Sequence, residues 1–378
     1  MVKTVDLDAC SKELAFLFAI LGFENNPGRL EQLMRNEQEL DWEQFLVLVD
    51  HHRVYPVVYA TLKKIEHHIV PPHILSALHT RYSQNTFRML YLTGEMERIS
   101  RALSDAGVHL LMMKGPVLAH KLYGDLSLRT SKDLDVLVPP HMAEAADHVL
   151  TSQGYVSLEN KKKKDRKKDH HLTYRHVQSN AEIELHWRLN RETGREPDFS
   201  ELWSRRQKSA ITTFPVYCLG DEDLFFYLLT HGARHGWFRL RWLDDLDHML
   251  KHDLDWREIN DRLHEFKFTH LKDHTLLLAS RLLGTPIKHA ERLKEDKRSV
   301  MLANLALQSI SGENVSKYRY TIKSPRQKVK HVLELFVPKA RDKEMLALPE
   351  SLSILYFPLR PVLWFCRRCK QWFLTKSN

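Results

Sequence analysis

The sequence predicts an α+β protein, in which a small mixed β-sheet is flanked by helical regions on its N-terminal and C-terminal sides. Glycine is scarce, with 13 residues in a chain of 378, whereas a large β-barrel or sandwich needs many glycine turns. Apolar residues recur at helical spacing before residue 107 and again after residue 221. Short apolar or alternating runs lie between these regions, and they are typical of strands.

The N-terminal region, residues 1–106, is expected to be helical. An apolar stripe spans Leu14–Leu21, and a second stripe follows Asp41, which is a suitable N-cap. A long helical pattern continues over 74–106. No residue pattern in this region predicts chemistry.

Residues 107–215 are expected to form the α/β core. The apolar run 109–113 ends at a Lys-Gly-Pro turn that leads into a short helix, and the alternating run 133–138 predicts a half-buried strand. A helix is expected over 143–154. Three further strand-like runs are present, and the last two predict a hairpin around a Gln-Ser-Asn turn: 154–158, 171–177 and 181–187.

Residues 216–310 are expected to form a helical domain that completes a cleft with the core. The acidic run 221–223 suits a helix N-terminus, and another helix is expected over 240–250. The last segment, 311–378, is basic and aromatic. Its tail is expected to dock onto the protein's own core, and peripheral contact with an anionic membrane is the alternative.

The composition favours a cytoplasmic protein with an anionic partner. The formal net charge of +9 suits nucleic acid, a nucleotide, an acidic sugar or a membrane surface, without choosing among them. Four scattered cysteines do not make a disulfide framework, and Cys366 and Cys369 lack two further nearby ligands for zinc. No apolar run reaches the roughly 18 residues of a membrane span, and no signal peptide is evident.

Asp133 and Asp135 are the sharpest feature of the sequence. As residues i and i+2 of a predicted strand, they point to one face, where two unpaired carboxylates repel each other. A divalent cation that prefers oxygen ligands removes this repulsion. A solvated strand face, or arginine partners, would explain a bare pair of this kind equally well.

The surroundings of this pair favour the metal interpretation. Lys114 and Gly115 lie after an apolar run and before a helix, where glycine allows a phosphate to approach and the helix N-terminus attracts negative charge. Glu184, on a later predicted strand, supplies a third carboxylate. Two metal ions held by three carboxylates form a layout for phosphoryl transfer, because they position a triphosphate and activate an attacking hydroxyl.

These residues resemble the polymerase-β-type nucleotidyltransferase superfamily and, more closely, a bacterial family of nucleotidyltransferases with mostly undefined substrates. The resemblance covers residues 10–260 and is most specific over 108–245. The matching pattern is Lys114-Gly115, Leu118, Leu122-Tyr123, Arg129, Ser131, Asp133-Leu-Asp135 and Glu184-Leu-His186-Trp187. The chain departs from the superfamily at Pro116, where a serine usually helps to hold phosphate, and in a longer gap before Asp133.

The resemblance implies an enzyme that uses Mg²⁺, or alternatively Mn²⁺, to transfer a nucleoside monophosphate from ATP or another NTP. The acceptor would be a hydroxyl or phosphate of a small molecule, saccharide or peptide, since the family is associated with exopolysaccharide, capsule and lasso-peptide gene clusters. Asp133, Asp135 and Glu184 would be the catalytic metal ligands. The nucleotide-binding residues would be Lys114, Gly115, Arg129, Ser131, His186, His231, His235 and Asp245.

His231 and His235 share one helix face at the spacing of a zinc protease site, but position 232 is glycine, so the general-base glutamate is missing. In the resembling family they recur with Trp237, Arg241 and Asp245. Two interpretations stay open. Either these residues hold the nucleotide or substrate, with Asp245 orienting an imidazole, or they form a buried polar network between two helices.

Histidines near the third carboxylate are further candidates. His186 shares the strand face of Glu184, and His170 and His171 precede a neighbouring strand. The basic run 161–168 is expected to be a solvated hairpin tip, and clamping of an acidic substrate is its alternative.

Two other functions stay open. A catalytically silent nucleotide-binding or scaffold protein of a biosynthetic cluster ranks below the enzyme, because all three acids are present. A nucleic-acid-modifying nucleotidyltransferase ranks third, since the chain shows no recognised RNA-binding module and no aromatic residue interrupts the basic run.

Overall fold

The computed structural model describes residues 5–7, 10–35, 40–65, 70–159, 170–189, 196–287, 295–334, 336–338, 342, 345–346 and 348–375. The basic run 161–168 lies outside them. The chain divides into two compact units, Met1–Tyr318 and Arg319–Asn378. The finer division into four segments stays a prediction.

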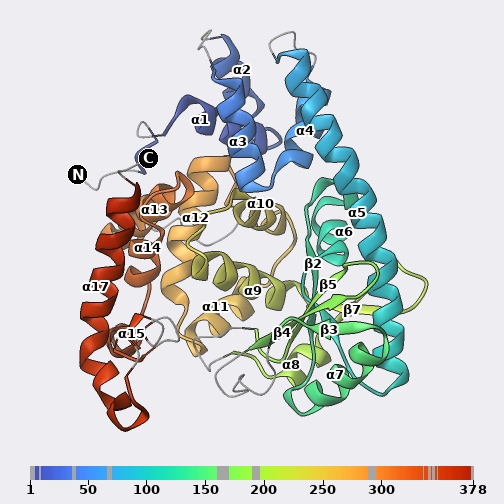
Figure 1. The fold of residues 1–378 in the computed structure, drawn as a ribbon. Coiled ribbons are helices and arrows are strands. Elements are labelled where there is room, and N and C mark those ends of the chain that lie inside the picture. The colour runs from blue at the N-terminus through green and yellow to red at the C-terminus, as the bar shows by residue number, and fades with distance from the viewer. Residues whose placement is uncertain are drawn as a thin grey trace. The chain divides into compact units, whose positions relative to one another are not determined.

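The first unit begins with helices, as expected. They are α1 (Lys12–Leu21), α2 (Pro27–Arg35), α3 (Trp42–His52), α4 (Tyr55–Lys64) and α5 (Pro72–Asp105). Asp41 caps α3 by accepting a hydrogen bond from the backbone N–H of Gln44. The long helix α5 runs beside the sheet (Figure 1), and the Asn85 side chain donates to the carbonyls of Ser127 and Arg129. This helix therefore fixes the loop that leads into the acidic strand.

The sheet is mixed and has seven strands in the order β3-β4-β5-β2-β1-β7-β6. They are β1 (Leu111–Met112), β2 (Asp133–Leu137), β3 (Tyr155–Ser157), β4 (His171–His176), β5 (Glu182–His186), β6 (Gln207–Ser209) and β7 (Val216–Cys218). β2 pairs with β5 and β1 pairs with β7 in parallel, and the other pairs are antiparallel. The α+β fold and the expected β4–β5 hairpin are confirmed, whereas the sequence did not predict β6 and β7.

Alternation along the central strands separates a core face from a polar face. Leu134 and Val136 of β2 and Ile183 and Leu185 of β5 are fully buried in the core, together with side chains from α5 and α7. The intervening side chains therefore point to the opposite face of the sheet. The connecting elements of this part are α6 (Pro116–Tyr123), η1 (Leu126–Leu128), η2 (Pro140–Met142), α7 (Ala143–Ser152) and α8 (Phe199–Ser204).

A second group of helices follows the sheet. It contains α9 (Asp221–Arg234), α10 (Leu240–Met249), α11 (Trp256–Glu265), α12 (Thr269–Leu283), α13 (Lys297–Ile310) and α14 (Val315–Thr321). α9 starts at the expected acidic residues, which complement the helix dipole. Figure 1 draws α9 and α10 between the sheet and α12.

The second unit contains α15 (Pro325–Glu334), η4 (Glu350–Leu355) and α17 (Tyr356–Thr375). Arg360 and Asp342 form a buried ion pair of 3.2 Å within it. Ile354 and Phe365 are among its exposed apolar side chains. Contact of this tail with a membrane stays a prediction. Among the helices that the structure describes, none combines the length and apolarity that crossing a membrane requires.

Candidate functional site

The parallel pairing of β2 and β5 gathers the predicted acids. Asp133 lies opposite Glu182, and Asp135 lies opposite Glu184. Adjacent strands are about 4.8 Å apart, and both strands turn their leucine and isoleucine side chains to the core. Asp133, Asp135 and Glu184, here named the acid cluster, therefore share the polar face of the sheet.

Asp135 is the acid of the cluster whose ionised carboxylate is most strongly stabilised by its neighbours. Its Oδ1 accepts a hydrogen bond from Lys114 Nζ at 3.0 Å and lies 3.4 Å from His186 Nε2. Burial favours the neutral acid, but Lys114 and His186 outweigh it and lower the pKa of Asp135 below its ordinary value. Asp135 is therefore an ionised carboxylate inside the protein.

His186 joins the acid cluster directly. Its Nε2 also lies 3.2 Å from Glu184 Oε2, while its buried Nδ1 has no hydrogen-bond partner among the described residues. Burial opposes protonation, but the hydrogen bonds to Asp135 and Glu184 raise the pKa of His186. Asp135, Glu184 and His186 offer ligand atoms that all lie within 4.8 Å of one another. The compact donor set thus includes His186, which the sequence suggested as a nucleotide contact, and omits Asp133.

Asp133 stands beside this donor set. Burial, Asp135 and Glu184 raise the pKa of Asp133 to about 6, although Lys114 and Arg241 oppose the shift. The cluster therefore carries negative charge that its neighbours do not fully compensate. A divalent cation that prefers carboxylate ligands, such as Mg²⁺ or Mn²⁺, fits this surplus.

The Lys114-Gly115 turn has the expected form of strand, turn and helix. Gly115 precedes α6 with φ 75° and ψ −142°, a backbone conformation that side chains with a Cβ rarely adopt. A Cβ at this position would lie 3.4 Å from Leu134 Cδ2. The Ser131 hydroxyl, which the sequence suggested as a nucleotide contact, donates to the Asp133 carbonyl at 3.0 Å. Gly115 and Ser131 therefore contribute to the packing and hydrogen bonding around the start of β2.

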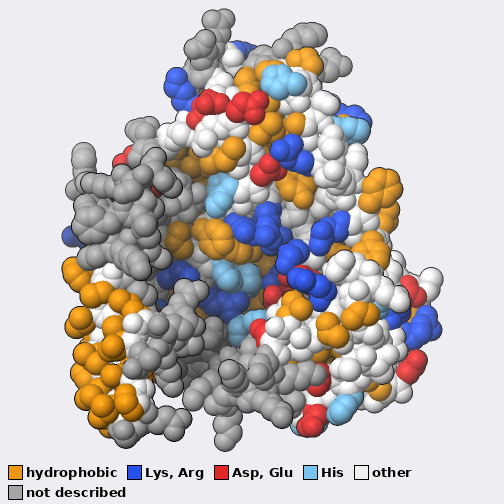
Figure 2. All heavy atoms as spheres, in the orientation of Figure 1, with side chains coloured by type: hydrophobic (Ala, Val, Ile, Leu, Met, Phe, Trp, Pro, Cys, Tyr) orange, Lys and Arg blue, Asp and Glu red, His pale blue; other side chains and the backbone are white. Residues whose placement is uncertain are grey.

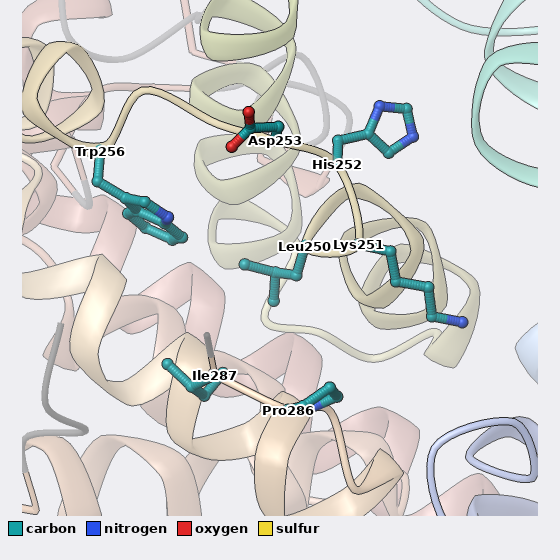
Figure 3. A pocket seen from close by; sticks show the side chains of 7 residues that line it. All are labelled: Leu250, Lys251, His252, Asp253, Trp256, Pro286 and Ile287. Carbon is teal, nitrogen blue, oxygen red and sulfur yellow. The ribbon is translucent and has the colours of Figure 1, made fainter. Parts of the chain in front are cut away.

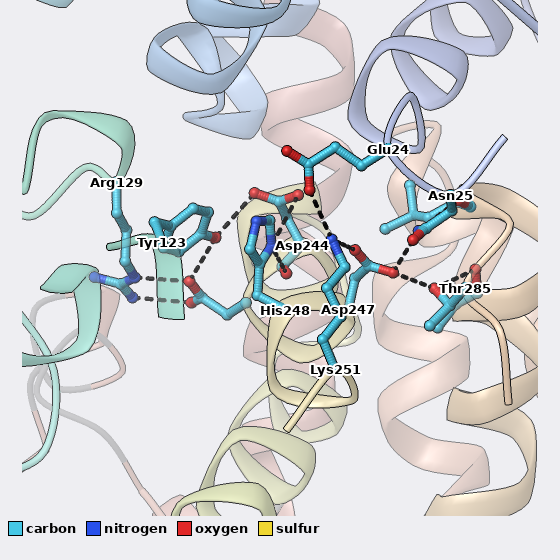
Figure 4. Close-up of polar contacts among 12 residues, drawn as sticks. Glu24, Asn25, Tyr123, Arg129, Asp244, Asp247, His248, Lys251 and Thr285 are labelled. Carbon is cyan, nitrogen blue, oxygen red and sulfur yellow. Dashed lines mark hydrogen bonds and ion pairs between the residues drawn. The ribbon is translucent and has the colours of Figure 1, made fainter. Parts of the chain in front are cut away.

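Arg129 and Asp245 lie in a buried network rather than at an open surface. Arg129 Nε and Nη2 donate to the two Asp245 oxygens at 2.7 and 2.9 Å, and the Tyr123 hydroxyl donates to Asp245 at 3.0 Å (Figure 4). The expectation that Asp245 orients an imidazole is therefore wrong, because arginine and tyrosine occupy its carboxylate. The alternative, a buried polar network, describes Asp245 correctly.

The same network anchors α10 on its other side (Figure 4). Asp247 contacts Lys251 at 3.4 Å and accepts a hydrogen bond from Asn25 at 2.8 Å. Asp244 accepts from Tyr123 at 2.9 Å. Through these contacts α10 is tied both to α6 and to the loop after α1.

His231 and His235 lie near the end of α9, with ring centroids 4.6 Å apart. Trp242 of α10 packs against both rings. Burial and the nearby Lys114 depress the pKa of His231 well below its ordinary value, so its imidazole is neutral. Lys114 also lies 5.6 Å from the ring centroid of Tyr227, one helical turn before His231. These contacts connect α9 to the acid cluster.

Two histidines outside the predicted nucleotide-binding set lie beside the acid cluster. The ring centroids of His170 and His171 are 5.6 and 5.0 Å from that of His186. The three imidazoles form a second candidate donor set. The β4–β5 register, in which His171 faces His186, explains this proximity.

A cavity of about 270 Å³ opens elsewhere (Figure 3). Its lining residues are Leu250, Lys251, His252, Asp253, Trp256, Pro286 and Ile287. No residue of the acid cluster lines it, so it is separate from the candidate site.

Tyr227 and Arg234 belong to the site region, although the sequence did not indicate them. Both lie on α9, and they affect the electrostatics of Lys114 and His231. The sequence contained one indication of their position: Tyr227, His231 and Arg234 have the spacing of residues on one helix face.

Comparison with known proteins gives a family match. No curated protein matches the chain. Among solved structures, an antigenic nucleotidyltransferase-like protein from Paracoccidioides brasiliensis is similar over 53% of this chain and 94% of its own, with 14% identity and a TM-score of 0.32. Residues 38–284 match the model of a family described as uncharacterised nucleotidyltransferase, and this match covers more than half of the chain. The chain therefore belongs to this uncharacterised nucleotidyltransferase family.

Proposed function

We propose that the chain is a nucleotidyltransferase that uses Mg²⁺, or Mn²⁺, to move a nucleoside monophosphate from an NTP to an acceptor. The acceptor is a hydroxyl or phosphate of a small molecule, saccharide or peptide. The observation that carries the proposal is the β2–β5 register, which places Asp135 opposite Glu184, with His186 in contact with both. Membership of the family supports the reaction class.

The residues that would hold the metal are Asp135 and Glu184, with Asp133 beside them. When bound, the metal supplies positive charge to the triphosphate oxygens and to the transition state. His186 and Lys114 keep Asp135 ionised, as its lowered pKa indicates. This chain therefore maintains an anionic ligand inside a buried site.

The remaining steps belong to the protein's own groups. The acceptor oxygen bonds to the α-phosphorus, the bond to the bridging oxygen breaks, and pyrophosphate leaves with that electron pair. The Glu184 side chain is 30% exposed, against 4% for Asp135, so Glu184 is the better placed carboxylate to take the proton of an acceptor hydroxyl. Lys114, next to the Gly115 turn, neutralises charge on the leaving pyrophosphate.

The test is product formation by the purified chain with each labelled NTP, Mg²⁺ and extracts of its source cells. Asp135→Asn and Glu184→Gln are expected to reduce product at least a hundredfold while the melting temperature remains measurable and cooperative. Undiminished product in both variants contradicts the proposal. NTP binding by calorimetry without turnover on any acceptor favours the silent nucleotide-binding alternative.

A further inference from the structure

Arg234, the last residue of α9, and Arg241, in the first turn of α10, are half-buried and differ from the fully buried arginines. Arg129, Arg262 and Arg360 each form an ion pair with an aspartate. Among the described residues, neither Arg234 nor Arg241 has a carboxylate within ion-pair distance.

The hydrogen bonds of Arg234 leave most of its guanidinium unsatisfied. Its Nη2 lies 3.2 Å from His231 Nδ1 and 3.5 Å from His235 Nε2. Its Nε and Nη1 are buried without a partner in the described part of the chain. Two imidazoles do not neutralise a guanidinium, and His231 is itself held neutral.

Arg241 is in a similar state. Its Nη1 donates to the carbonyl and the hydroxyl of Thr130, at 2.8 and 3.0 Å, and its buried Nε has no partner among the residues that the structure describes. Burial and the neighbouring Arg129 lower the pKa of Arg241 to about 10, although the more distant Asp245 and Asp133 oppose the shift. A guanidinium that has buried N–H groups and no carboxylate within ion-pair distance in the described part of the chain favours the binding of an anion beside it.

Both arginines act on the same region as the acid cluster. Arg241 donates to the carbonyl of Thr130, three residues before Asp133. Arg234 contacts His231, which lies one helical turn after Tyr227, and the Tyr227 ring centroid is 5.6 Å from Lys114 Nζ. Figure 2 shows Lys, Arg and His side chains gathered at the centre of this face, where Figure 1 draws α9 and α10 next to the sheet. Surplus positive charge on α9 and α10 thus adjoins surplus negative charge on β2 and β5.

We propose that Arg234 and Arg241 form a phosphate subsite that binds the β- and γ-phosphates of the NTP. The inference rests on the proposed function, whose substrate is a metal–triphosphate complex. The surplus negative charge of the acid cluster would face the metal ion, and the surplus positive charge of the two arginines would face the phosphates. Guanidinium groups suit this role, since their N–H groups donate in pairs to phosphate oxygens. A phosphorylated acceptor offers the same chemistry and must be distinguished by experiment.

The test is calorimetric binding of inorganic tripolyphosphate to the full chain in EDTA, which removes any metal contribution. Arg234→Gln and Arg241→Gln are expected to raise the Kd about 10- to 100-fold, the range for a lost charge-assisted hydrogen bond. Arg257→Gln, which removes the same charge from an exposed position on α11, is the matched control and should leave the Kd unchanged. Because neither arginine has a carboxylate within ion-pair distance among the described residues, their variants should retain or gain thermal stability, whereas a structural role predicts a loss.

The outcomes distinguish the NTP from a phosphorylated acceptor as the source of the bound phosphate. They also test the phosphate subsite separately from the proposed function. The β,γ-phosphate assignment is supported if the two arginine variants lose much more affinity for the NTP than for the nucleoside monophosphate. Unchanged NTP affinity with lost affinity for a sugar phosphate overturns it in favour of the acceptor. No tripolyphosphate binding by the wild type, or equal binding by both variants, overturns the subsite. Tripolyphosphate binding without transfer to any acceptor contradicts the proposed function alone.

Discussion

Arg129 and Asp245, which are 116 residues apart in the chain, form a two-point ion pair with N–O distances of 2.7 and 2.9 Å. Both side chains are almost completely buried. The pair joins the loop before β2 to α10, and α10 carries Arg241. This contact therefore connects the acid cluster and the proposed phosphate subsite.

Breaking this pair from one side should destabilise the protein strongly. Asp245→Asn leaves the buried Arg129 without its counter-charge, and we expect a loss of about 3 kcal/mol or more in the free energy of unfolding. Urea denaturation followed by circular dichroism measures it. Asp50→Asn is the control, because the Arg81–Asp50 pair is partly exposed and should cost at most about 1 kcal/mol. Unchanged stability with weakened NTP binding would instead support the phosphate role that the sequence suggested for Arg129.

Metal binding should stabilise the wild-type chain and depend on the acid cluster. At a concentration of Mg²⁺ or Mn²⁺ well above the Kd, we expect a gain of about 1–3 kcal/mol in unfolding free energy. Asp135→Asn and Glu184→Gln should abolish this gain, because each removes an anionic ligand. Glu182→Gln is the matched control, since Glu182 lies on the same strand face but pairs with Arg175 and Lys132. An equal metal-induced shift in all variants, measured by thermal unfolding, would place the metal elsewhere.

Asp244 should make stability fall as the pH rises from about 4 to about 6. Burial and the neighbouring Asp247 raise the pKa of Asp244 to about 6, although His248 opposes them. The folded chain therefore binds this proton more tightly than the unfolded chain does, and the resulting stabilisation disappears as the pH rises through that range. Asp244→Asn should remove about 1–3 kcal/mol of this pH dependence, with the amide oxygen still able to accept from Tyr123.

The measurement is the difference between wild-type and Asp244→Asn unfolding curves across this pH range. The difference is needed because Asp133 titrates in the same range. The exposed Asp253→Asn serves as the control and should leave the pH dependence unchanged. Identical slopes for the wild type and Asp244→Asn would show that Asp244 is ionised throughout.

The local pattern of residues was sufficient to predict the strands that carry the acid cluster. Alternation in β2 and β5 separates core leucines from acids, and this period of two does not depend on distant contacts. β6 and β7 are three residues each, and a run that short has no detectable period. Their strand conformation depends on pairing with each other and, for β7, with β1.

At the site, the structure differs from the sequence-based expectation where the partner of a residue is distant in the chain. The family resemblance grouped Asp245 with the histidines of α9 and suggested that they interact, but its real partner, Arg129, follows η1. Likewise, nothing local shows that Arg234 has no carboxylate within ion-pair distance in the described part of the chain, because that property depends on what α10 and the sheet place around it. Charge pairing inside a fold is set by tertiary contacts, and a sequence pattern gives only the candidates.

Gly232 of α9 should tolerate even a methyl group poorly, because Trp237 packs directly on it. A Cβ at position 232 would clash with Trp237 Cζ3, and the buried Trp237 donates its indole N–H to the Tyr318 hydroxyl at 3.1 Å. This ring closes the connection between α9 and α10, so moving it shifts Arg234 and Arg241 relative to each other. Gly232→Ala should therefore cost about 1–3 kcal/mol in unfolding free energy and weaken tripolyphosphate binding, as urea denaturation and calorimetry measure.

Gly94→Ala on α5 is the control for this substitution. Apart from the adjoining backbone of α5 itself, no described atom lies within 4 Å of the position that the added Cβ would take, so alanine there should stabilise the helix by about 0.5–1 kcal/mol. Its affinity for tripolyphosphate should equal that of the wild type, because α5 carries no part of the proposed subsite. Equal stability and equal tripolyphosphate affinity of the two variants would show that Trp237 does not position Arg234 and Arg241.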